Sequence, residues 1–452
     1  MIPNAVIYLA IMLVFVIAWF VWVKRPVYEA LFLSFLLLVG VTNTWGNIFT
    51  YIDGALNTSL LYSMIVFVAM SQLLSHTKVI DSCVYLILSL MGRLTGGAGY
   101  ASIVASSFMG ALSGSGPGNV MATGVITIPA MKKSGFPPEL AANVESVSSY
   151  MGNMIPPSSN IVGALGAFMA LYPDSGITSG QFWVVLWGVA IYFIVQRMLM
   201  VFAFCKYYKV KPMAKEDIPS LKETFRTGWK GLMLPVIILV PFILDSVCAD
   251  WIASRLGDAG ASSFSKCLLF FIAGVAAIYT LIIADDKKSV TLPKMANLFT
   301  SKMKSLVGPI AACLFGYMVG ELFSDIDVTT QLGTFLESLN MPLWGLALFI
   351  PLLTAFLGMI IPGSSQVVIF GPVFIAAFAA AGLDPLLAAA MLPCICGTMC
   401  GITPPLALGM YAGMSIAESD FKKTLINDLW WVGTQYVLEF VLLLGVLPVI
   451  GL

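Results

Sequence analysis

Hydroxyl, amide and glycine residues gather at four places that interrupt long apolar stretches of the chain. Two are Gly/Ser-rich segments, at 113–119 and 362–366, and two are prolyl pairs, at 156–157 and 404–405. Such segments do not readily continue an α-helix, so each exposes carbonyl groups at one helix end and N–H groups at the next. Carbonyl and hydroxyl oxygens suit a small hard cation, whereas helix N-termini suit a carboxylate. The pattern therefore predicts that a cation and an organic anion bind at these interruptions.

The candidate sodium- and substrate-binding residues are the polar, glycine and proline residues of these segments and their flanks. In the first half of the chain they are Ser113, Ser115, Asn119, Asn153, Pro156, Ser158, Ser159 and Asn160. In the second half they are Gly363, Ser364, Ser365, Gln366, Thr398, Thr403 and Pro404. A single Ser, Thr or Asn in a membrane helix more often packs or bonds nearby backbone, so the prediction depends on the clustering of the set.

Three ionisable residues lie inside apolar stretches and are candidates for a role in coupling or in structure, because a charge there is costly. They are Glu145, Arg197 and Glu439. Arg197 is close enough to the cytoplasmic end of its stretch to extend its charge into water. Glu145 is a candidate structural hydrogen-bonding residue, and Glu439 is a candidate partner of Arg197 or of another subunit. Proton coupling is assigned to neither carboxylate.

The sequence predicts no catalytic residues and no transition-metal site. It contains no HExxH, GxSxG or GxxxxGK[ST] motif, which argues against an enzyme and against an ATP-driven pump. Cys394, Cys396 and Cys400 lie close together, but the only histidine is His76, and the spacing is not that of a zinc site. We therefore interpret the thiols as packing residues. No cofactor is expected.

Composition places these residues in a membrane protein. The chain has 452 residues, 59% hydrophobic and 10% charged, whereas a soluble domain has about a quarter charged residues. Apolar stretches of about 20 residues are long enough to span the hydrocarbon core as helices, which satisfy their own backbone hydrogen bonds. The net charge is zero, so nothing indicates a nucleic-acid partner. The first stretch, 2–23, lacks the features of a cleaved signal peptide and is interpreted as a retained helix.

The distribution of basic residues predicts the topology, because cationic loops stay on the cytoplasmic side. Arg93 and Lys132 are both predicted to be cytoplasmic, yet the 38 residues between them carry no charge. A re-entrant hairpin at 93–131 resolves this conflict, and a second hairpin, at 340–381, is predicted to enter from the opposite side. The fold predicted is an all-α polytopic membrane protein with about ten spans and two re-entrant hairpins. The segments 80–92 and 290–303 are candidate interfacial helices.

The two halves resemble each other at an offset of about 248 residues. Phe136-Pro137-Pro138 corresponds to Leu383-Asp384-Pro385, and a prolyl pair follows each motif. The first repeat, 1–228, contains the first hairpin and an interrupted helix at 138–171. The second repeat, 229–452, contains the second hairpin and an interrupted helix at 384–417. Inverted repeats with broken helices are typical of secondary transporters, although an ion or solute channel remains an alternative.

Motifs around the hairpins and breaks resemble those of the large membrane subunit of TRAP (tripartite ATP-independent periplasmic) transporters. In the first half they are Gly110–Ser115, Asn119–Gly124, Ile128–Lys133, Phe136–Glu139, Val144–Glu145 and Ile155–Pro157. In the second half they are Gly358–Pro362 and Ile402–Pro405. The resemblance is strongest over 93–165 and extends over 350–420.

The resemblance implies sodium-coupled import of a small organic anion, such as a carboxylate, sugar acid or dicarboxylate, by an elevator mechanism. It also implies two partners: a small membrane subunit of about four helices, and a periplasmic or lipid-anchored substrate-binding protein. The implied location is the bacterial cytoplasmic (inner) membrane, with the chain in contact with the bilayer through many spans. The alternatives are a stand-alone ion and organic-anion symporter of the same superfamily, without a binding protein, or a channel.

Overall fold

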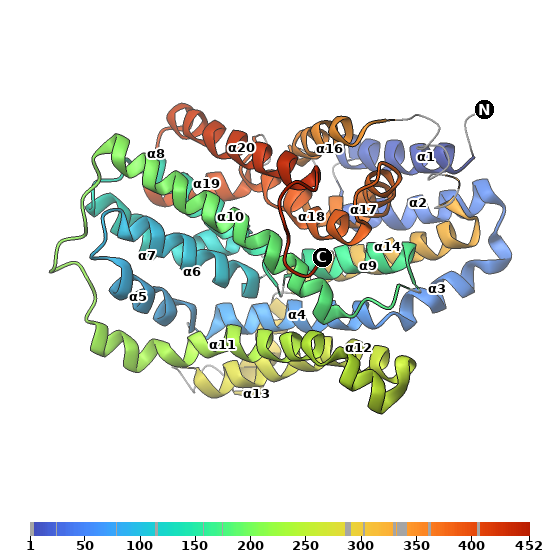
Figure 1. Cartoon of the computed structure of the whole chain (residues 1–452), viewed down its shortest axis with the longest axis horizontal. Coiled ribbons are helices and arrows are strands. Elements are labelled where there is room, and N and C mark those ends of the chain that lie inside the picture. Colours follow the sequence, from blue (N-terminus) through green and yellow to red (C-terminus); the bar gives the residue numbers. More distant parts are fainter. Residues whose placement is uncertain are drawn as a thin grey trace.

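The chain folds into helices that belong to two groups, which we call the frame and the hairpin body. The structure, a computed structural model, describes residues 4–452 except for 24, 78, 114–115, 157, 174, 285–290, 302, 329–330, 332–340, 360–362 and 405–406. No strand occurs in the described part of the chain, which confirms the predicted all-α fold (Figure 1).

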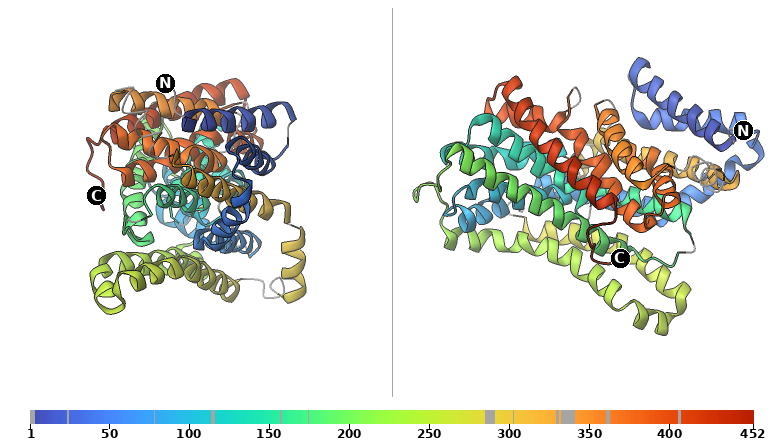
Figure 2. Two further views of the ribbon diagram at one scale, coloured as in Figure 1. Left: turned by 90° about the vertical axis from the view of Figure 1, so that its right-hand side faces the viewer. Right: turned by 45° about the horizontal axis from the view of Figure 1, so that its top comes forward.

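The frame consists of α1–α5 and α11–α14, in which α2 packs against α14, α4 against α12, and α5 against α11. Its helices are α1 (Asn4–Ala18), α2 (Val27–Thr42), α3 (Ile48–Asn57), α4 (Ser59–His76), α5 (Val79–Met91), α11 (Leu221–Val247), α12 (Ala249–Ile283), α13 (Leu292–Ser301) and α14 (Met303–Asp325). A π-helical turn, Trp19–Val23, extends α1. Two views show α11 and α12 as a layer along one side of the molecule (Figure 2).

The hairpin body consists of α6–α10 and α16–α20, whose helices pack on one another across the two halves of the chain. In the first half they are α6 (Gly97–Ser113), α7 (Gly116–Lys133), α8 (Pro138–Met151), α9 (Ser159–Leu171) and α10 (Ser179–Tyr208). In the second half they are α16 (Leu343–Gly358), α17 (Gly363–Ala380), α18 (Pro385–Gly397), α19 (Leu408–Ala417) and α20 (Phe421–Leu443).

Helix length and composition agree with a protein that crosses a membrane several times. Three described helices are long and apolar enough to span a bilayer by themselves: Ser179–Tyr208, Leu221–Asp245 and Gly363–Ala380. Seven shorter apolar helices accompany them, among them Pro385–Gly401 and Leu408–Ala417. Large apolar side chains on the outer surface, such as Phe271 and Ile278 of α12, are exposed in the isolated chain. They suit contact with lipid.

The first hairpin, α6 and α7, has both of its open ends on the side of the basic loop that follows α10. The backbone N–H of Met213 in this loop donates to the Gly92 carbonyl before α6, with an N···O distance of 3.1 Å. The N–H of Lys211 donates to the Ser134 carbonyl after α7 at 3.0 Å. The chain therefore enters and leaves this hairpin on one side, as the uncharged stretch predicted.

The second hairpin, α16 and α17, opens at the other end of α20. Near the start of α20, Lys423 Nζ lies 3.7 Å from Glu139 Oε1, which follows the first hairpin. Just beyond the end of α20, Gly445 lies beside Leu383, which follows the second hairpin. Because α20 is a continuous helix, the two hairpins open toward opposite ends of the molecule.

Several predicted boundaries are corrected by the structure. The sequence predicts one basic cytoplasmic loop from Lys206 to Lys230. Instead, Lys222, Arg226 and Lys230 lie on α11, which begins at Leu221, because Lys, Arg and Glu extend a helix well beyond its apolar part. The candidate interfacial segment 80–92 forms α5, which is packed between α11 and α6 with most of its side chains buried. The other candidate, 290–303, contains the short amphipathic helix α13.

Candidate functional site

Both predicted helix interruptions are present. In the first half, α8 ends at Met151, a single 3-10 turn covers Gly152–Met154, and α9 starts at Ser159. The Ser158 hydroxyl donates to the Asn153 carbonyl across this break, at 2.6 Å. In the second half, α18 ends at Gly397, a 3-10 turn covers Met399–Gly401, and α19 starts at Leu408. Here the Thr403 hydroxyl donates to the Met399 carbonyl at 2.9 Å.

Each hairpin is seated on the break of its own half. A Cβ atom added to Gly152 would overlap the backbone of Gly110, the fourth residue from the end of α6. At the start of α17, the Gly363 N–H donates to Cys400 Sγ at 3.2 Å. A Cβ atom on Gly358 would lie 2.9 Å from Cys400 Cβ. Glycine at these positions therefore permits the hairpins to approach the non-helical backbone directly.

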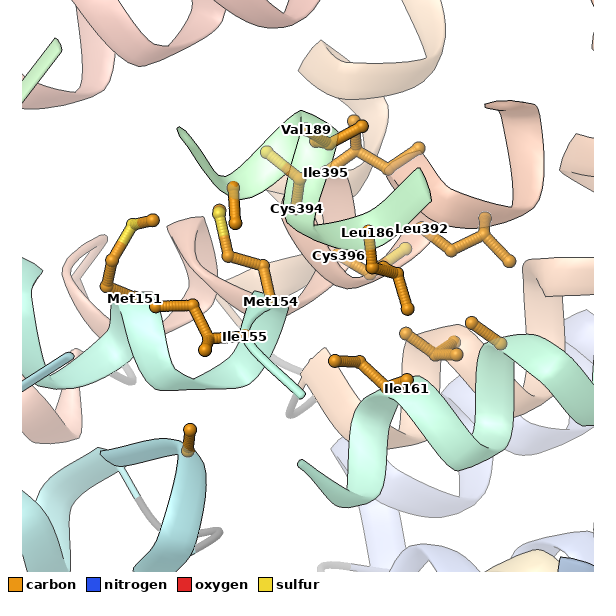
Figure 3. Close-up of a cluster of buried hydrophobic side chains, with 14 of the residues drawn as sticks. Met151, Met154, Ile155, Ile161, Leu186, Val189, Leu392, Cys394, Ile395 and Cys396 are labelled. Carbon is orange, nitrogen blue, oxygen red and sulfur yellow. The ribbon is translucent and has the colours of Figure 1, made fainter. Parts of the chain in front are cut away.

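The two breaks also contact each other. Asn153 Nδ2 in the first break donates to the Gly397 carbonyl at the second, with a distance of 2.8 Å. A Cβ atom on Gly397 would come within 2.8 Å of Asn160 Nδ2, so Asn160 of α9 approaches the same point. Apolar side chains surround this junction, with Met151, Met154 and Ile155 of the first half near residues of α18 such as Cys394 and Cys396 (Figure 3).

Tyr150 fills the space between the first hairpin and the second break. Its ring packs on Gly116 at the start of α7 and on Gly401 and Gly409 of the second half, and a Cβ atom at any of these glycines would collide with it. The side chain is buried, with 6% of its surface exposed. Tyr150 thereby joins the two halves where small residues leave room for a large ring.

The structure brings most of the predicted site residues to the helix breaks and to the hairpin tips, which are the ends where the two helices of a hairpin are joined. Asn153, Ser158, Thr398 and Thr403 donate hydrogen bonds to backbone carbonyls there, and Pro156 and Pro404 lie in the turns. Gln366 is fully buried in the first turn of α17. For Asn160, Ser364 and Ser365, no hydrogen-bond partner is found among the residues that the structure describes. Backbone position alone is described for Ser113, at the end of α6, and Ser159, at the start of α9, and Ser115 lies outside the described residues.

Asn119 belongs to a different cluster, centred on the fully buried Glu145. Its Nδ2 donates to the Ser106 carbonyl and to the Ser149 hydroxyl, both at 2.8 Å. Five hydroxyl groups donate to the Glu145 carboxylate: Ser102 at 2.7 Å, Ser106 at 2.9 Å, Thr123 at 2.5 Å, Thr127 at 2.5 Å and Ser149 at 3.0 Å. Glu145 therefore joins α6, α7 and α8 through hydrogen bonds, in agreement with its interpretation as a structural residue.

Sequence reasoning did not identify the hydroxyl partners of Glu145, although their spacing carried a signal. Ser102 and Ser106 are four residues apart in α6, and Thr123 and Thr127 are four apart in α7. Residues at this spacing share one face of a helix. Two hydroxyl-bearing faces on the arms of one hairpin, followed by a glutamate in the next helix, predict such a cluster.

Arg197 does not extend into water, so that interpretation is wrong. Its side chain is 1% exposed, because α10 packs against α8, α18 and α20 over this part of its length. Arg197 Nη2 donates to Gln435 Oε1 at 2.8 Å, and Gln435 Nε2 donates to Glu439 Oε1 at 2.8 Å. No direct ion pair joins Arg197 to Glu439 in the described structure, so the predicted partnership is made through Gln435, which the sequence did not single out.

Asp428 of α20 is a further buried carboxyl group, which sequence reasoning did not identify. It accepts a hydrogen bond from Asn143 Nδ2 at 3.1 Å and lines a cavity of about 660 Å³ between α16, α20 and the second break. Thr403 and Pro404 line the same cavity, whose other walls are apolar side chains such as Phe356. The described lining supplies a carboxyl group and apolar side chains but no cationic group, so this cavity is unsuited to an organic anion.

Comparison with known proteins agrees with this architecture. A family model for the tripartite ATP-independent periplasmic transporter, DctM component, matches residues 6–450. The C4-dicarboxylate TRAP transporter large permease protein DctM of Rhodobacter capsulatus is 24% identical over 402 residues, which cover 85% of this chain and 84% of that protein. The sialic acid TRAP transporter large permease protein SiaM of Vibrio cholerae is 25% identical over 401 residues, which cover 86% and 84% of the two chains.

A solved structure shares the fold. The YdaH transporter of Alcanivorax borkumensis superimposes with a TM-score of 0.62 at 18% sequence identity, over 89% of this chain and 88% of that one. At this identity the likeness concerns the fold alone. The family match, by contrast, extends over almost the entire sequence and includes both hairpins and both helix breaks. The chain therefore belongs to the DctM family, the large membrane component of tripartite ATP-independent periplasmic transporters.

Proposed function

We propose that this permease subunit imports a small organic anion, such as a carboxylate, sugar acid or dicarboxylate, together with sodium ions. The observation that carries the proposal is the contact between the two broken helices, in which Asn153 donates to the Gly397 carbonyl. Non-helical backbone at membrane depth must be buried in protein or line a polar cavity. Two such segments that contact each other inside one body supply backbone carbonyls, hydroxyls and helix N-termini in one place.

The breaks offer oxygen ligands of the kind that sodium prefers. In the second half, the hydroxyls of Ser364 and Ser365 and the turn at Thr398–Thr403 lie on the tip and break that Gly363 and Cys400 join. In the first half, the backbone of Gly110 in α6 lies against Gly152 of the break. One sodium site in each half is consistent with this correspondence, because carbonyl and hydroxyl oxygens bind hard cations without a formal charge.

The anion is proposed to bind near the N-terminal ends of α9 and α17. Helix N-termini carry partial positive charge and free N–H groups, so they favour a carboxylate. The amide of Asn160, in the first turn of α9, adds a polar group with no partner among the described residues. The names of the two relatives refer to a C4-dicarboxylate and to sialic acid, which are both carboxylic acids. They support the same class of cargo for this chain.

The proposed mechanism is an elevator movement of the hairpin body against the frame, in the bacterial inner membrane. The two groups meet where α5 packs against α6, where α11 packs against α10, and where α14 packs against α9 and α17. The proposed partners are a small membrane subunit of about four helices and a periplasmic or lipid-anchored substrate-binding protein. A stand-alone symporter without a binding protein is the alternative, and uptake that does not respond to added binding protein would favour it.

Sodium-dependent uptake into proteoliposomes tests the proposal. Purified permease and its small subunit are reconstituted with the binding protein, and uptake of radiolabelled succinate and sialic acid is measured with an inward sodium gradient. We expect accumulation of one of these acids with sodium and none when choline replaces sodium. Equal uptake in choline would contradict the coupling, and single-channel conductance without accumulation would indicate a channel.

The two tips provide a sharper test. Combined Ser115→Ala and Ser365→Ala substitutions should raise the sodium concentration for half-maximal uptake about tenfold, since each lost oxygen ligand costs about 0.5–1.5 kcal/mol. The fold should remain intact, as measured by gel filtration and thermal unfolding. Ser254→Ala is the matched control, because Ser254 is exposed on the frame and bonds only its own helix. An unchanged sodium requirement in the double variant would contradict the assignment of the tips.

A further inference from the structure

We propose that Arg197, Gln435 and Glu439 form a positioning bridge that orients Thr398 for cation binding at the second helix break. The inference rests on the proposed function and assigns new residues to it. All three side chains are buried, with exposed fractions of 1%, 2% and 0%. Buried ionisable side chains are a poor source of stability, because apolar residues of similar size often stabilise as well or better. The arrangement therefore calls for a role other than packing.

The charges on either side determine which way the Gln435 amide faces. A guanidinium group can only donate hydrogen bonds, so Arg197 Nη2 requires the amide oxygen at 2.8 Å. An acceptor is required on the other side, where Glu439 Oε1 accepts from Gln435 Nε2 at 2.8 Å. The second N–H of the same amide donates to the Thr398 hydroxyl oxygen. If the Gln435 amide were reversed, its NH₂ group would face the N–H groups of Arg197. Only the observed orientation makes the hydrogen bonds to Arg197, Glu439 and Thr398.

This orientation determines the hydrogen bonding of Thr398 as well. Because its hydroxyl oxygen accepts from Gln435, its own proton is directed elsewhere, and it donates to the Cys394 carbonyl at 2.9 Å. A hydroxyl group has one proton and two lone pairs. One lone pair remains, and no other described residue donates a hydrogen bond to it. Thr398 is thus held in an orientation in which its hydroxyl oxygen has one lone pair that can bind a cation.

Because of where Thr398 lies, the bridge also affects the contact between the two helix breaks. Thr398 is the residue directly after α18, and the preceding carbonyl, that of Gly397, accepts the hydrogen bond from Asn153 of the first break. Constraining Thr398 therefore also constrains the carbonyl at which the two breaks meet. Glu439 also restrains the end of α18 directly, because Cys394 Sγ donates to Glu439 Oε1 at 3.1 Å.

At its other end, the bridge reaches the first broken helix. Arg197 Nε contacts the Val147 carbonyl of α8 at 3.4 Å, and Arg197 Nη1 donates to the Phe193 carbonyl within α10 at 3.3 Å. The bridge thereby connects α8 and α10 of the first half to α18 and α20 of the second. The helices α10 and α20 lie side by side and contact each other (Figure 2). The geometry of the second break is therefore set relative to the first.

The test replaces Gln435 with methionine, which has nearly the same size and cannot bridge. We expect the sodium concentration for half-maximal uptake to rise about five- to tenfold, the effect of losing one or two buried hydrogen bonds. At saturating sodium, the half-saturating concentration of the organic acid and the maximal rate should change less than about twofold. A merely structural role would lower the maximal rate and leave the sodium requirement unchanged.

Gln196→Met is the matched control. Gln196 lies next to Arg197 on α10, donates to Thr434 of α20 at 2.7 Å and accepts from Arg197 Nη1 at 2.9 Å. It thus bonds the same helix pair and the same arginine but does not contact Thr398. Its sodium requirement should equal that of the wild type.

A double variant tests whether Gln435 acts through Thr398. Thr398→Val removes the hydroxyl, and adding Gln435→Met should then raise the sodium requirement no further, because both changes remove one function. Additive effects would overturn the inference, as would a wild-type sodium requirement in Gln435→Met. If Gln435→Met does not fold, Gln435→Asn provides the same test. Asparagine keeps the amide, but its side chain is too short to bridge Arg197 and Thr398. Sodium-independent uptake by the wild type would instead overturn the proposed function, and this inference with it.

Discussion

Replacing Glu145 with leucine should abolish transport and lower the free energy of unfolding by about 3 kcal/mol. Five hydroxyl groups donate to this fully buried carboxylate. Thr123 and Thr127 can keep the carbonyl acceptors that they already contact within α7. Ser106 can donate instead to the Thr123 hydroxyl oxygen, 3.1 Å away. The hydroxyls of Ser102 and Ser149 would lose this acceptor, at a cost of about 1–2 kcal/mol each. Thermal unfolding of the purified protein and uptake in proteoliposomes measure the two effects.

Glu145→Gln separates the charge of this residue from its hydrogen bonding. Glutamine keeps one acceptor oxygen, and hydroxyl groups facing its NH₂ can rotate to accept. We expect its unfolding midpoint to lie much nearer to that of the wild type, with transport retained. If the glutamine variant fails as completely as the leucine variant, the negative charge itself is required, and the structural interpretation of Glu145 is wrong. A leucine variant as stable as the wild type would contradict the cluster altogether.

Gly152→Ala should prevent the first hairpin from seating on the first helix break. The added Cβ would overlap the Gly110 carbonyl carbon and the Ala111 nitrogen, which are backbone atoms that cannot rotate away. The backbone angles of Gly152, φ −57° and ψ −22°, are ordinary for alanine, so the effect comes from the close approach alone. Overpacking of this kind costs about 1–3 kcal/mol and displaces backbone. We expect the Gly152→Ala variant to show no uptake in proteoliposomes and a lower midpoint of thermal unfolding than the wild type.

The control for this prediction is Gly433→Ala in α20, where an added Cβ would meet nothing within 4 Å. Alanine in a helix interior is favoured over glycine by about 0.5–1 kcal/mol, so this variant should be at least as stable as the wild type. Uptake by Gly152→Ala that matches uptake by Gly433→Ala would show that the hairpin does not need the backbone contact seen here.

Local chemistry determined the parts of the molecule that the sequence predicted well. The uncharged stretches 94–131 and 338–383 could be identified as hairpins because basic residues flank the first and long apolar segments must cross or re-enter a bilayer. The prolyl pairs at 156–157 and 404–405 could be identified as helix breaks because proline lacks an N–H group and clashes with the preceding turn. Such properties belong to neighbouring residues, so sequence order suffices to reveal them.

Tertiary structure alone decided which polar groups satisfy one another. Ser102 and Glu145 are 43 positions apart, and Arg197 and Gln435 are 238 positions apart, so neither pairing follows from local spacing. Arg197 lies near a helix end in the sequence, but neighbouring helices cover it and bury its charge. The sequence by itself determined where the helices break and which residue types lie there. The packing of α8, α10, α18 and α20 decided their partners, because a buried polar group must bond whichever groups the fold brings within reach.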